Sequence, residues 1–219
     1  MELIGHGHSC IEIRLNDGTN LLFDPFINGN PLADVSLEDL HPDYILITHG
    51  YSDHIGDMLA IAQANKATII AIAEVAQGVK AHGMNLGGRY VFPFGSVKFV
   101  PALHSSGYEI DGVMTYMGEA SGIILEAEDK KIYHAGDTAL FSDMRLFAKD
   151  KSIDVAFLPI GDNYTMGPED ALEAVSYLNP KITIPIHYNT FPVIQQNPAI
   201  FVEQVVGGKV LNPGETILV

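Results

Sequence analysis

The sequence predicts an α/β fold in which β-sheets are covered by helices. Many short apolar runs have the length of strands, and a few segments with helical spacing stand between them in β–α–β order. Of the 219 residues, 47% are hydrophobic and 18% are charged, so the chain can bury enough surface to offset the entropy lost on folding. Because the sequence contains no linker-like segment and no repeat, we expect one domain over residues 1–219.

The first half of the chain predicts a hairpin followed by a strand and a helix. Ile11, Ile13 and Leu15 alternate, Asp17-Gly18 offers a tight turn, and an apolar run resumes at 21–23. A continuous apolar run predicts a strand at 44–48, and the spacing of apolar residues predicts a helix at 55–64. A buried strand at 67–71 and a helix at 74–80 follow.

The second half is richer in strands. We expect strands around Val91 and at 97–100, 114–117, 122–125, 132–134, 155–158 and 182–186. Helices are expected at 140–148 and at 168–178, where Pro168 suits the first turn of a helix.

Charge and composition exclude several classes of partner. The chain has 27 Asp and Glu against 12 Lys and Arg, a net charge of −15 that disfavours nucleic acids and anionic membranes. No apolar run reaches the roughly 18 residues that a spanning helix needs. Cys10 is the single cysteine and no export signal is evident, so we expect a cytoplasmic protein.

Side chains that bind metals gather where predicted strands end. His49, Asp53 and His54 follow the strand at 44–48, and the other three, His104, Asp137 and His187, also follow strands. Ligands of α/β proteins bind at such carboxyl ends, because the loops converge there. Taken singly, Asp53 and Asp137 could each be a helix N-cap, but four imidazoles and two carboxylates in this position favour a metal site.

The type of ligand indicates the metal and its chemistry. Imidazole together with carboxylate suits zinc, manganese or iron rather than calcium or magnesium. Such an ion lowers the pKa of bound water from about 16 toward 7 and supplies a hydroxide nucleophile near neutral pH. We interpret His6, His41 and His82 as surface or capping residues and His134 as a strand residue.

These residues resemble the signature of the metallo-β-lactamase fold, His-x-His-x-Asp-His with a downstream His, a bridging Asp and a final His. Over nearly the whole chain, residues 7–9, 23–26, 134–138, 158–168 and 185–192 resemble an uncharacterised bacterial and archaeal family of metal-dependent hydrolases. That family is related to the ascorbate-6-phosphate lactonase branch. The resemblance implies a four-layer αββα sandwich with the site at one edge, and relatives in that branch imply a homo-oligomer.

The resemblance also implies roles for individual residues. His49 and His104 would hold a first ion, Asp53, His54 and His187 a second, and Asp137 would bridge them. Asp24 would orient a ligand imidazole by accepting its distal N–H. Further candidates for the pocket wall are His8, Asn163, Thr165 and Asn189.

Tyr51 departs from the family pattern, because it stands where the second His of the motif is expected. Three outcomes follow: Tyr51 coordinates through its oxygen, the first site is weakened, or activity is lost while the fold persists. A phenol with an ordinary pKa near 10 is a poor ligand, which favours the second outcome.

Three functional hypotheses result. The leading one is a metal-dependent hydrolase that cleaves an ester-like, lactone, amide or phosphoester bond of a small molecule, with Asp53, His54 and Asp137 at the centre of catalysis. The second, motivated by Tyr51, is a catalytically silent metal-binding protein. The third, a nuclease, suits the fold but not the charge.

Overall fold

The computed structural model describes residues 1–76 and 80–219 and contains two mixed β-sheets packed face to face. The first sheet has the order β15-β1-β2-β3-β4-β5-β6. Its strands are β1 (Glu2–Gly5), β2 (Ile11–Arg14), β3 (Asn20–Phe23), β4 (Tyr44–Leu46), β5 (Thr68–Ile72), β6 (Ala81–Met84) and β15 (Thr216–Leu218). The strands from β3 to β6 run parallel, whereas β15, β1, β2 and β3 pair antiparallel.

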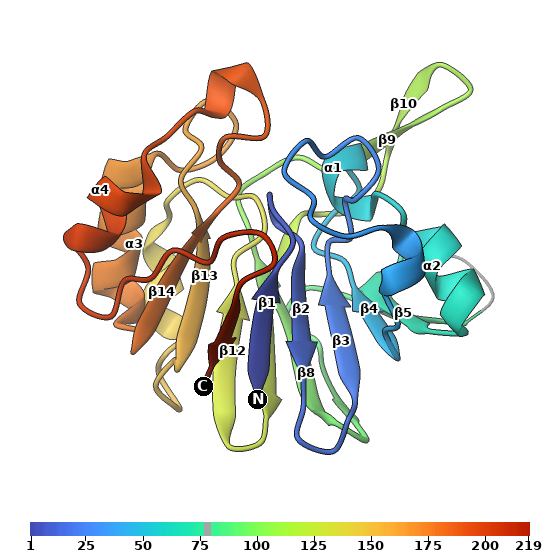
Figure 1. Cartoon of the computed structure of the whole chain (residues 1–219), viewed down its shortest axis with the longest axis horizontal. Coiled ribbons are helices and arrows are strands. Elements are labelled where there is room, and N and C mark those ends of the chain that lie inside the picture. The colour runs from blue at the N-terminus through green and yellow to red at the C-terminus, as the bar shows by residue number, and fades with distance from the viewer. Residues whose placement is uncertain (77–79) are drawn as a thin grey trace.

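The second sheet has the order β14-β13-β12-β11-β8-β7. Its strands are β7 (Arg89–Phe92), β8 (Gly95–Pro101), β11 (Ser121–Ala127), β12 (Lys130–His134), β13 (Val155–Pro159) and β14 (Ile182–Ile186). The strands β12, β13 and β14 are parallel. A separate hairpin, β9 (Gly107–Ile110) with β10 (Val113–Tyr116), projects from the body of the molecule (Figure 1).

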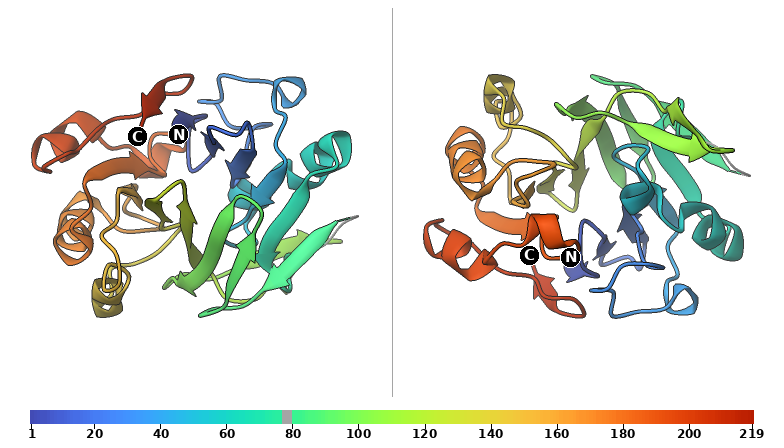
Figure 2. Two further views of the ribbon diagram at one scale, coloured as in Figure 1. Left: turned by 90° about the horizontal axis from the view of Figure 1, so that it is seen from below. Right: turned by 90° about the horizontal axis from the view of Figure 1, so that it is seen from above.

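Helices cover the outer faces of both sheets, as Figure 2 shows from two ends of the molecule. The short helix α1 (Ser52–Ile55) and α2 (Met58–Asn65) lie beside the first sheet, and α3 (Pro168–Leu178) and α4 (Pro198–Glu203) lie beside the second (Figure 1). Three 3₁₀ turns complete the described elements: η1 (Leu37–Asp39), η2 (Ser142–Leu146) and η3 (Pro192–Ile194).

Three apolar clusters fill the space between these layers. The central one lies between the sheets and includes Leu21 and Phe23 of the first sheet and Phe99 and Phe157 of the second, all fully buried. A second cluster joins the second sheet to α3 and α4, and a third joins the first sheet to α2. Two sheets between two helical layers make the metallo-β-lactamase fold, so the predicted four-layer sandwich is confirmed.

The structure confirms most of the predicted elements and corrects three helices. The helix predicted at 55–64 is divided, because Gly56 has φ +44 and a Cβ there would lie 2.3 Å from the Pro25 carbonyl oxygen. The segment predicted as a helix at 140–148 forms only η2, since Phe141 is extended before it. The prediction of a helix at 74–80 is wrong, because Glu74, Val75, Ala76 and Lys80 are not helical. Residues 77–79 lie outside the described part of the chain.

Two further observations concern the outside of the molecule. Strands β1 and β15 pair, so the first and last residues of this chain lie close together (Figure 1). Among residues 1–76 and 80–219, no helix has the length and apolarity needed to cross a membrane.

Candidate metal centre

The candidate site lies where several parallel strands of both sheets end. The first sheet supplies the loop after β3, which begins at Asp24, and the loop after β4, which runs through residues 47–51 into α1. The second sheet supplies the loops after β8, β12 and β14. The carboxyl ends of parallel strands point to one edge, so the predicted residues converge despite wide separation in sequence.

Two groups of metal-type side chains face one another in this region. One consists of His49, His104 and Asp137, and the other of His8, Asp53, His54 and His187. Within each group, one ligand atom from each residue lies within 4.8 Å of the ligand atoms of all the others. All six predicted imidazoles and carboxylates are therefore together, and His8 is added to them.

Asp137 lies between the two groups. Its Oδ2 is 3.0 Å from His187 Nε2 and 3.6 Å from His104 Nε2, while its Oδ1 is 3.3 Å from His54 Nε2. The Nε2 of His49 is 3.9 Å from Oδ2. A carboxylate has two oxygens, so this position allows Asp137 to serve both groups at once.

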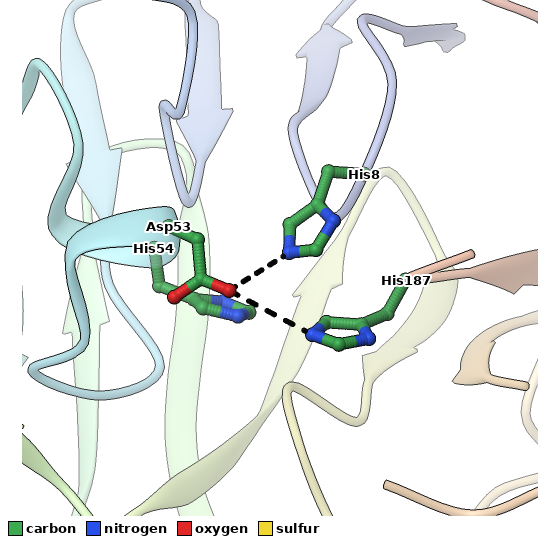
Figure 3. Close-up of side chains that lie close together, drawn as sticks. All are labelled: His8, Asp53, His54 and His187. Carbon is green, nitrogen blue, oxygen red and sulfur yellow. Dashed lines mark hydrogen bonds and ion pairs between the residues drawn. The ribbon is translucent and has the colours of Figure 1, made fainter. Parts of the chain in front are cut away.

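The second group is arranged around Asp53, as Figure 3 shows. Asp53 Oδ2 lies 3.2 Å from His8 Nε2 and 3.9 Å from His187 Nε2. The other ring nitrogen of His8 is 2.8 Å from Thr190 Oγ1, which fixes the ring orientation. The His8 side chain thus presents Nε2 toward Asp53 from the loop between β1 and β2.

Asp24 orients two of the imidazoles from behind. It is fully buried, and its Oδ2 lies 2.8 Å from His54 Nδ1. The same oxygen accepts a 2.7 Å hydrogen bond from Thr48 Oγ1, which in turn lies 3.0 Å from His49 Nδ1. Both rings therefore have Nδ1 engaged at the back and present Nε2 to the centre, the arrangement typical of ligand histidines.

The site has unusual electrostatics because it concentrates ionisable groups away from water. Burial would raise the pKa of Asp137, but His187 and His54 beside it hold that pKa well below its usual range. Burial would lower the pKa of His54, and the flanking Asp137 and Asp24 reverse this and raise it. Burial, together with neighbouring His54, lowers the pKa of His49 to about 3, so this ring is neutral at pH 7 and its nitrogen is free to act as a ligand.

Several buried polar atoms at the centre fit a bound cation. His49 Nε2, His54 Nε2 and Asp137 Oδ1 are shielded from solvent and make no hydrogen bond among the described residues, although the last two lie 3.3 Å apart as an ion pair. Buried polar atoms are normally paired, so these call for a ligand that accepts electron pairs. A donor set of imidazoles and carboxylates suits a transition ion, and the residues present fit one or two such ions.

Tyr51 lies beside the first group, but its hydroxyl oxygen is not one of the clustered ligand atoms. Its ring centroid is 5.3 Å from that of His49 and 5.6 Å from that of His104. The Tyr51 hydroxyl hydrogen-bonds to Ser105 Oγ in the loop after β8. The phenol is thus already engaged by a neutral partner on the wall of the site.

A cavity of about 520 Å³ opens over the two groups. Its lining includes Asp53, His104, Asp137 and His187 together with side chains that bind no metal. A volume of this size is ordinary for the binding site of a small molecule.

The remaining histidines divide as the sequence suggested, with one correction. His134 is a strand residue whose Nε2 lies 3.0 Å from the Ser9 carbonyl, and His41 is exposed. The interpretation of His6 as a surface or capping residue is wrong, because it is 3% exposed and paired with Glu12 and Asp34. His82 is half-buried on β6 against Tyr90.

Of the further candidates for the pocket wall, only His8 reaches the site directly. Thr165 Oγ1 donates to the Met166 carbonyl, and Asn189 Oδ1 accepts from the Gln196 N–H, so both stabilise their own loops. Asn163 is exposed on the loop before Thr165.

Comparison with known proteins agrees with this geometry. A family profile described as "Beta-lactamase superfamily domain" matches residues 19–188. A protein of Enterococcus faecalis named "UPF0173 metal-dependent hydrolase" is 96% identical over 224 aligned residues and is covered, like this chain, over 100% of its length. The chain belongs to the UPF0173 metal-dependent hydrolase family.

More distant relatives also cover nearly the whole chain. A protein of the same name from Anoxybacillus flavithermus is 53% identical, with 99% of each chain covered. The solved structure of Igni18, described as a novel metallo hydrolase from the archaeon Ignicoccus hospitalis, is 36% identical with a TM-score of 0.89. The structural match covers 99% of this chain and 97% of the Igni18 chain.

Proposed function

We propose that the protein hydrolyses an ester-like, lactone, amide or phosphoester bond of a small molecule with one or two divalent transition ions. The observation that carries the proposal is the position of Asp137, whose two oxygens face both groups of ligand atoms. Zinc is the first choice of ion, and manganese and iron share its preference for imidazole and carboxylate. We also propose that the protein is cytoplasmic and forms a homo-oligomer, and that it has no nucleic-acid or membrane partner.

The residues of the site would have different roles in this reaction. A bound ion supplies Lewis acidity and a water of lowered pKa. His49, His54, His104 and His187 hold their nitrogens toward the centre. The Asp53 side chain is 23% exposed and lines the cavity, so a water beside the substrate can donate a hydrogen bond to it. His8 keeps that carboxylate in place from the opposite side.

One observation favours a second candidate, a metal-binding protein that has lost catalysis. Tyr51 stands at a ligand position of the family motif, and its hydroxyl is engaged with Ser105. The first group then relies on His49, His104 and Asp137, which is a smaller donor set than the second group has. In this alternative the second group alone holds an ion.

Metal content and hydrolysis measured on the same variants separate the two candidates. The purified chain, reconstituted with zinc, manganese or iron, is assayed with a panel of esters, lactones and phosphodiesters. We expect hydrolysis that falls by at least about 100-fold in Asp137→Ala and His187→Ala, in line with the loss of a catalytic ligand. His41→Ala, at an exposed position away from the site, is the matched control.

Three results would decide against the small-molecule hydrolase. Bound metal without hydrolysis of any substrate in the panel supports the silent protein. Less than about 0.1 equivalents of metal after reconstitution removes the basis of both candidates, because the ligand set would then bind no ion. Hydrolysis of nucleic acid that disappears in the same two variants would instead support a nuclease.

A further inference from the structure

We propose that the part of the substrate outside the reacting bond is uncharged and apolar, with an aromatic or branched group as the best fit. This inference rests on the proposed hydrolase function and names the substrate class of the same site. A neutral ester or lactone that carries such a group is the expected substrate. A compound with a remote phosphate or carboxylate, such as a sugar phosphate, is not.

The first support is the aromatic character of the cavity. Phe26, Tyr51, Tyr164 and Phe191 all line it. The rings of Phe26 and Phe191 are 6.4 Å apart at an angle of 29°, and each packs against the ring of His8 at 5.7 and 5.6 Å. This contact holds an apolar wall next to the second group of ligands. Tyr164 is 54% exposed and offers a further ring face at the same cavity.

The second support is that no lining residue carries a positive charge. Apart from the metal-type side chains Asp53, Asp137, His104 and His187 and the four aromatic rings, the described lining consists of Ser52 and Ser105. Proteins that bind a phosphate or carboxylate group normally meet it with the positive charge of Arg or Lys. The hydroxyls of Ser52 and Ser105 are neutral and give no such charge.

The sequence explains this absence of charge. All 12 Lys and Arg residues belong to the described part of the chain, and the stretches that contain none of them include 15–65, 99–129, 132–144, 152–180 and 182–208. Every residue that lines the cavity falls within one of these stretches. The loops that build the site are thus free of cations throughout, and not only at the positions that touch the cavity.

Four of the cations lie near the amino ends of parallel strands. Lys66 and Lys80 come before β5 and β6, Lys130 opens β12, and Lys181 comes before β14. Strands β12 and β14 carry site residues at their other ends, and β5 and β6 run parallel to β4, which does so too. These four charges therefore lie on the edge of the sandwich away from the site. The net charge of −15 adds to this effect, because an acidic protein repels anions on average.

These features act differently on the two ends of a substrate. The reacting bond lies against the ligand groups, where bound ions supply positive charge. A remote anion would lose its hydration without gaining a partner, which is unfavourable. A remote phenyl or branched alkyl group would instead bury its surface against aromatic rings, which is favourable.

Two matched pairs of esters test the inference on the metal-reconstituted full chain. Methyl phenylacetate and methyl acetate share a leaving group and differ in the phenyl ring, whereas dimethyl and monomethyl succinate differ by one remote negative charge. We expect kcat/KM to be at least about tenfold higher for the phenyl ester and for the neutral diester, an effect of the size that burying a ring produces. Equal values, or a preference for the anionic monoester, would overturn the inference.

A variant series tests whether the cavity wall causes the preference. Tyr164→Ala should reduce the phenyl preference about threefold or more by raising KM, and Tyr164→Phe should retain it because the ring remains. Tyr116→Ala is the control, since Tyr116 is 63% exposed on β10 and does not line the cavity. Tyr164→Arg should selectively improve monomethyl succinate. If Tyr164→Ala leaves the preference for the phenyl ester unchanged, the proposed wall is wrong.

A binding readout keeps the inference separate from the proposed function. Saturation-transfer NMR with phenylacetamide and with benzenesulfonate compares a neutral and an anionic ring compound on the same protein. Binding of the amide alone supports the inference even if no ester is hydrolysed, a result that would count against the hydrolase only. Binding of the sulfonate alone, or of neither compound, contradicts the inference whether or not hydrolysis is observed.

Discussion

Asp24 illustrates how a residue outside the cavity can control the site. It contacts His54 directly and His49 through Thr48, and it is fully buried. The backbone N–H of Thr48 donates to its other oxygen at 2.8 Å, so both carboxylate oxygens are engaged. The orientation of one imidazole in each group therefore depends on a single side chain.

Replacing this carboxylate should weaken metal binding. Asp24→Asn keeps the volume but removes the charge that fixes the imidazole nitrogens, and we expect the affinity for zinc to fall about 10- to 100-fold. Titration against a competing chelator measures the change. Asp17→Asn, in the exposed turn before β3, is the control. Unchanged affinity in Asp24→Asn would show that Asp24 does not orient the ligands.

Tyr51 can be tested as a ligand by two substitutions. Because its hydroxyl pairs with Ser105, Tyr51→Phe should leave the bound metal per chain unchanged. Tyr51→His restores an imidazole to the first group and should raise its affinity at least about tenfold. Elemental analysis after dialysis at limiting metal compares the variants. Loss of an ion in Tyr51→Phe would show that the phenol coordinates.

The sequence predicted most of the residues of the site, but it indicated His8 only as a candidate for the pocket wall. The six predicted residues each follow a strand, which is a signal that can be read locally. His8 lies in a loop between antiparallel strands, and its role arises from contact with Thr190, 182 residues away. No local pattern encodes that contact, although the neighbouring Gly7 with φ +85 marks an unusual turn.

Among the elements, the loop from β4 into α1 has little space to vary. A Cβ on Gly50 would lie 2.5 Å from Met117 Cβ, and the Gly50 N–H donates to Ser106 Oγ at 3.0 Å. This contact links the ligand loop to the base of the β9–β10 hairpin. His49 and Tyr51 flank Gly50, so movement of this loop would displace the first group.

Gly50→Ala should therefore destabilise the protein and its first metal group together. Overpacking of this kind typically lowers the free energy of unfolding by about 1 to 3 kcal/mol. Denaturant unfolding and metal titration of the same variant measure both effects. Ser52→Ala, exposed at the start of α1, serves as the comparison. A fully stable Gly50→Ala with normal metal affinity would contradict the proposed tightness of this loop.

Strand β2 carries a buried acid that should govern stability in acid. Burial would raise the pKa of Glu12, but hydrogen bonds from His6, Arg14 and Asn20 outweigh it and lower that pKa to about 2. A carboxyl with a lowered folded pKa stabilises the protein above its ordinary pKa near 4.5. That stabilisation is lost as the pH falls toward 2.

Glu12→Gln should thus lower the free energy of unfolding by about 2 kcal/mol at neutral pH. The difference from the unchanged protein should shrink as the pH falls from about 4.5 toward 2. Urea unfolding at several pH values provides the measurement, with the exposed Glu38→Gln as the control. A difference that stays constant over this range would show that the Glu12 contacts do not depend on its charge.

Secondary structure was predictable wherever one strong local signal acted. Pro168 at the first turn and the apolar spacing to Leu178 gave the bounds of α3 as they are observed. The prediction was weaker where tertiary contacts decide, as at Gly56, where the nearby Pro25 carbonyl leaves no room for a side chain. The β1–β15 pairing joins the two ends of the chain, and no local pattern specifies it.

Across the whole molecule, each ligand group draws on both sheets. His49 comes from the first sheet, whereas His104 and Asp137 come from the second; in the other group only His187 comes from the second. Bound ions would therefore join the two halves of the sandwich. Four of the cations, Lys66, Lys80, Lys130 and Lys181, lie at the amino ends of parallel strands, on the edge away from the site.

The central claim is that these distant loops form one metal centre for one or two ions, with Asp137 between the two groups of ligands. Anomalous diffraction from crystals of the zinc-reconstituted protein tests it most directly. We expect a peak beside His54 and His187, and a second beside His49 and His104 when both groups are filled, each within about 2.0 to 2.2 Å of an oxygen of Asp137. Peaks elsewhere, or none at Asp137 in fully reconstituted protein, would contradict the account.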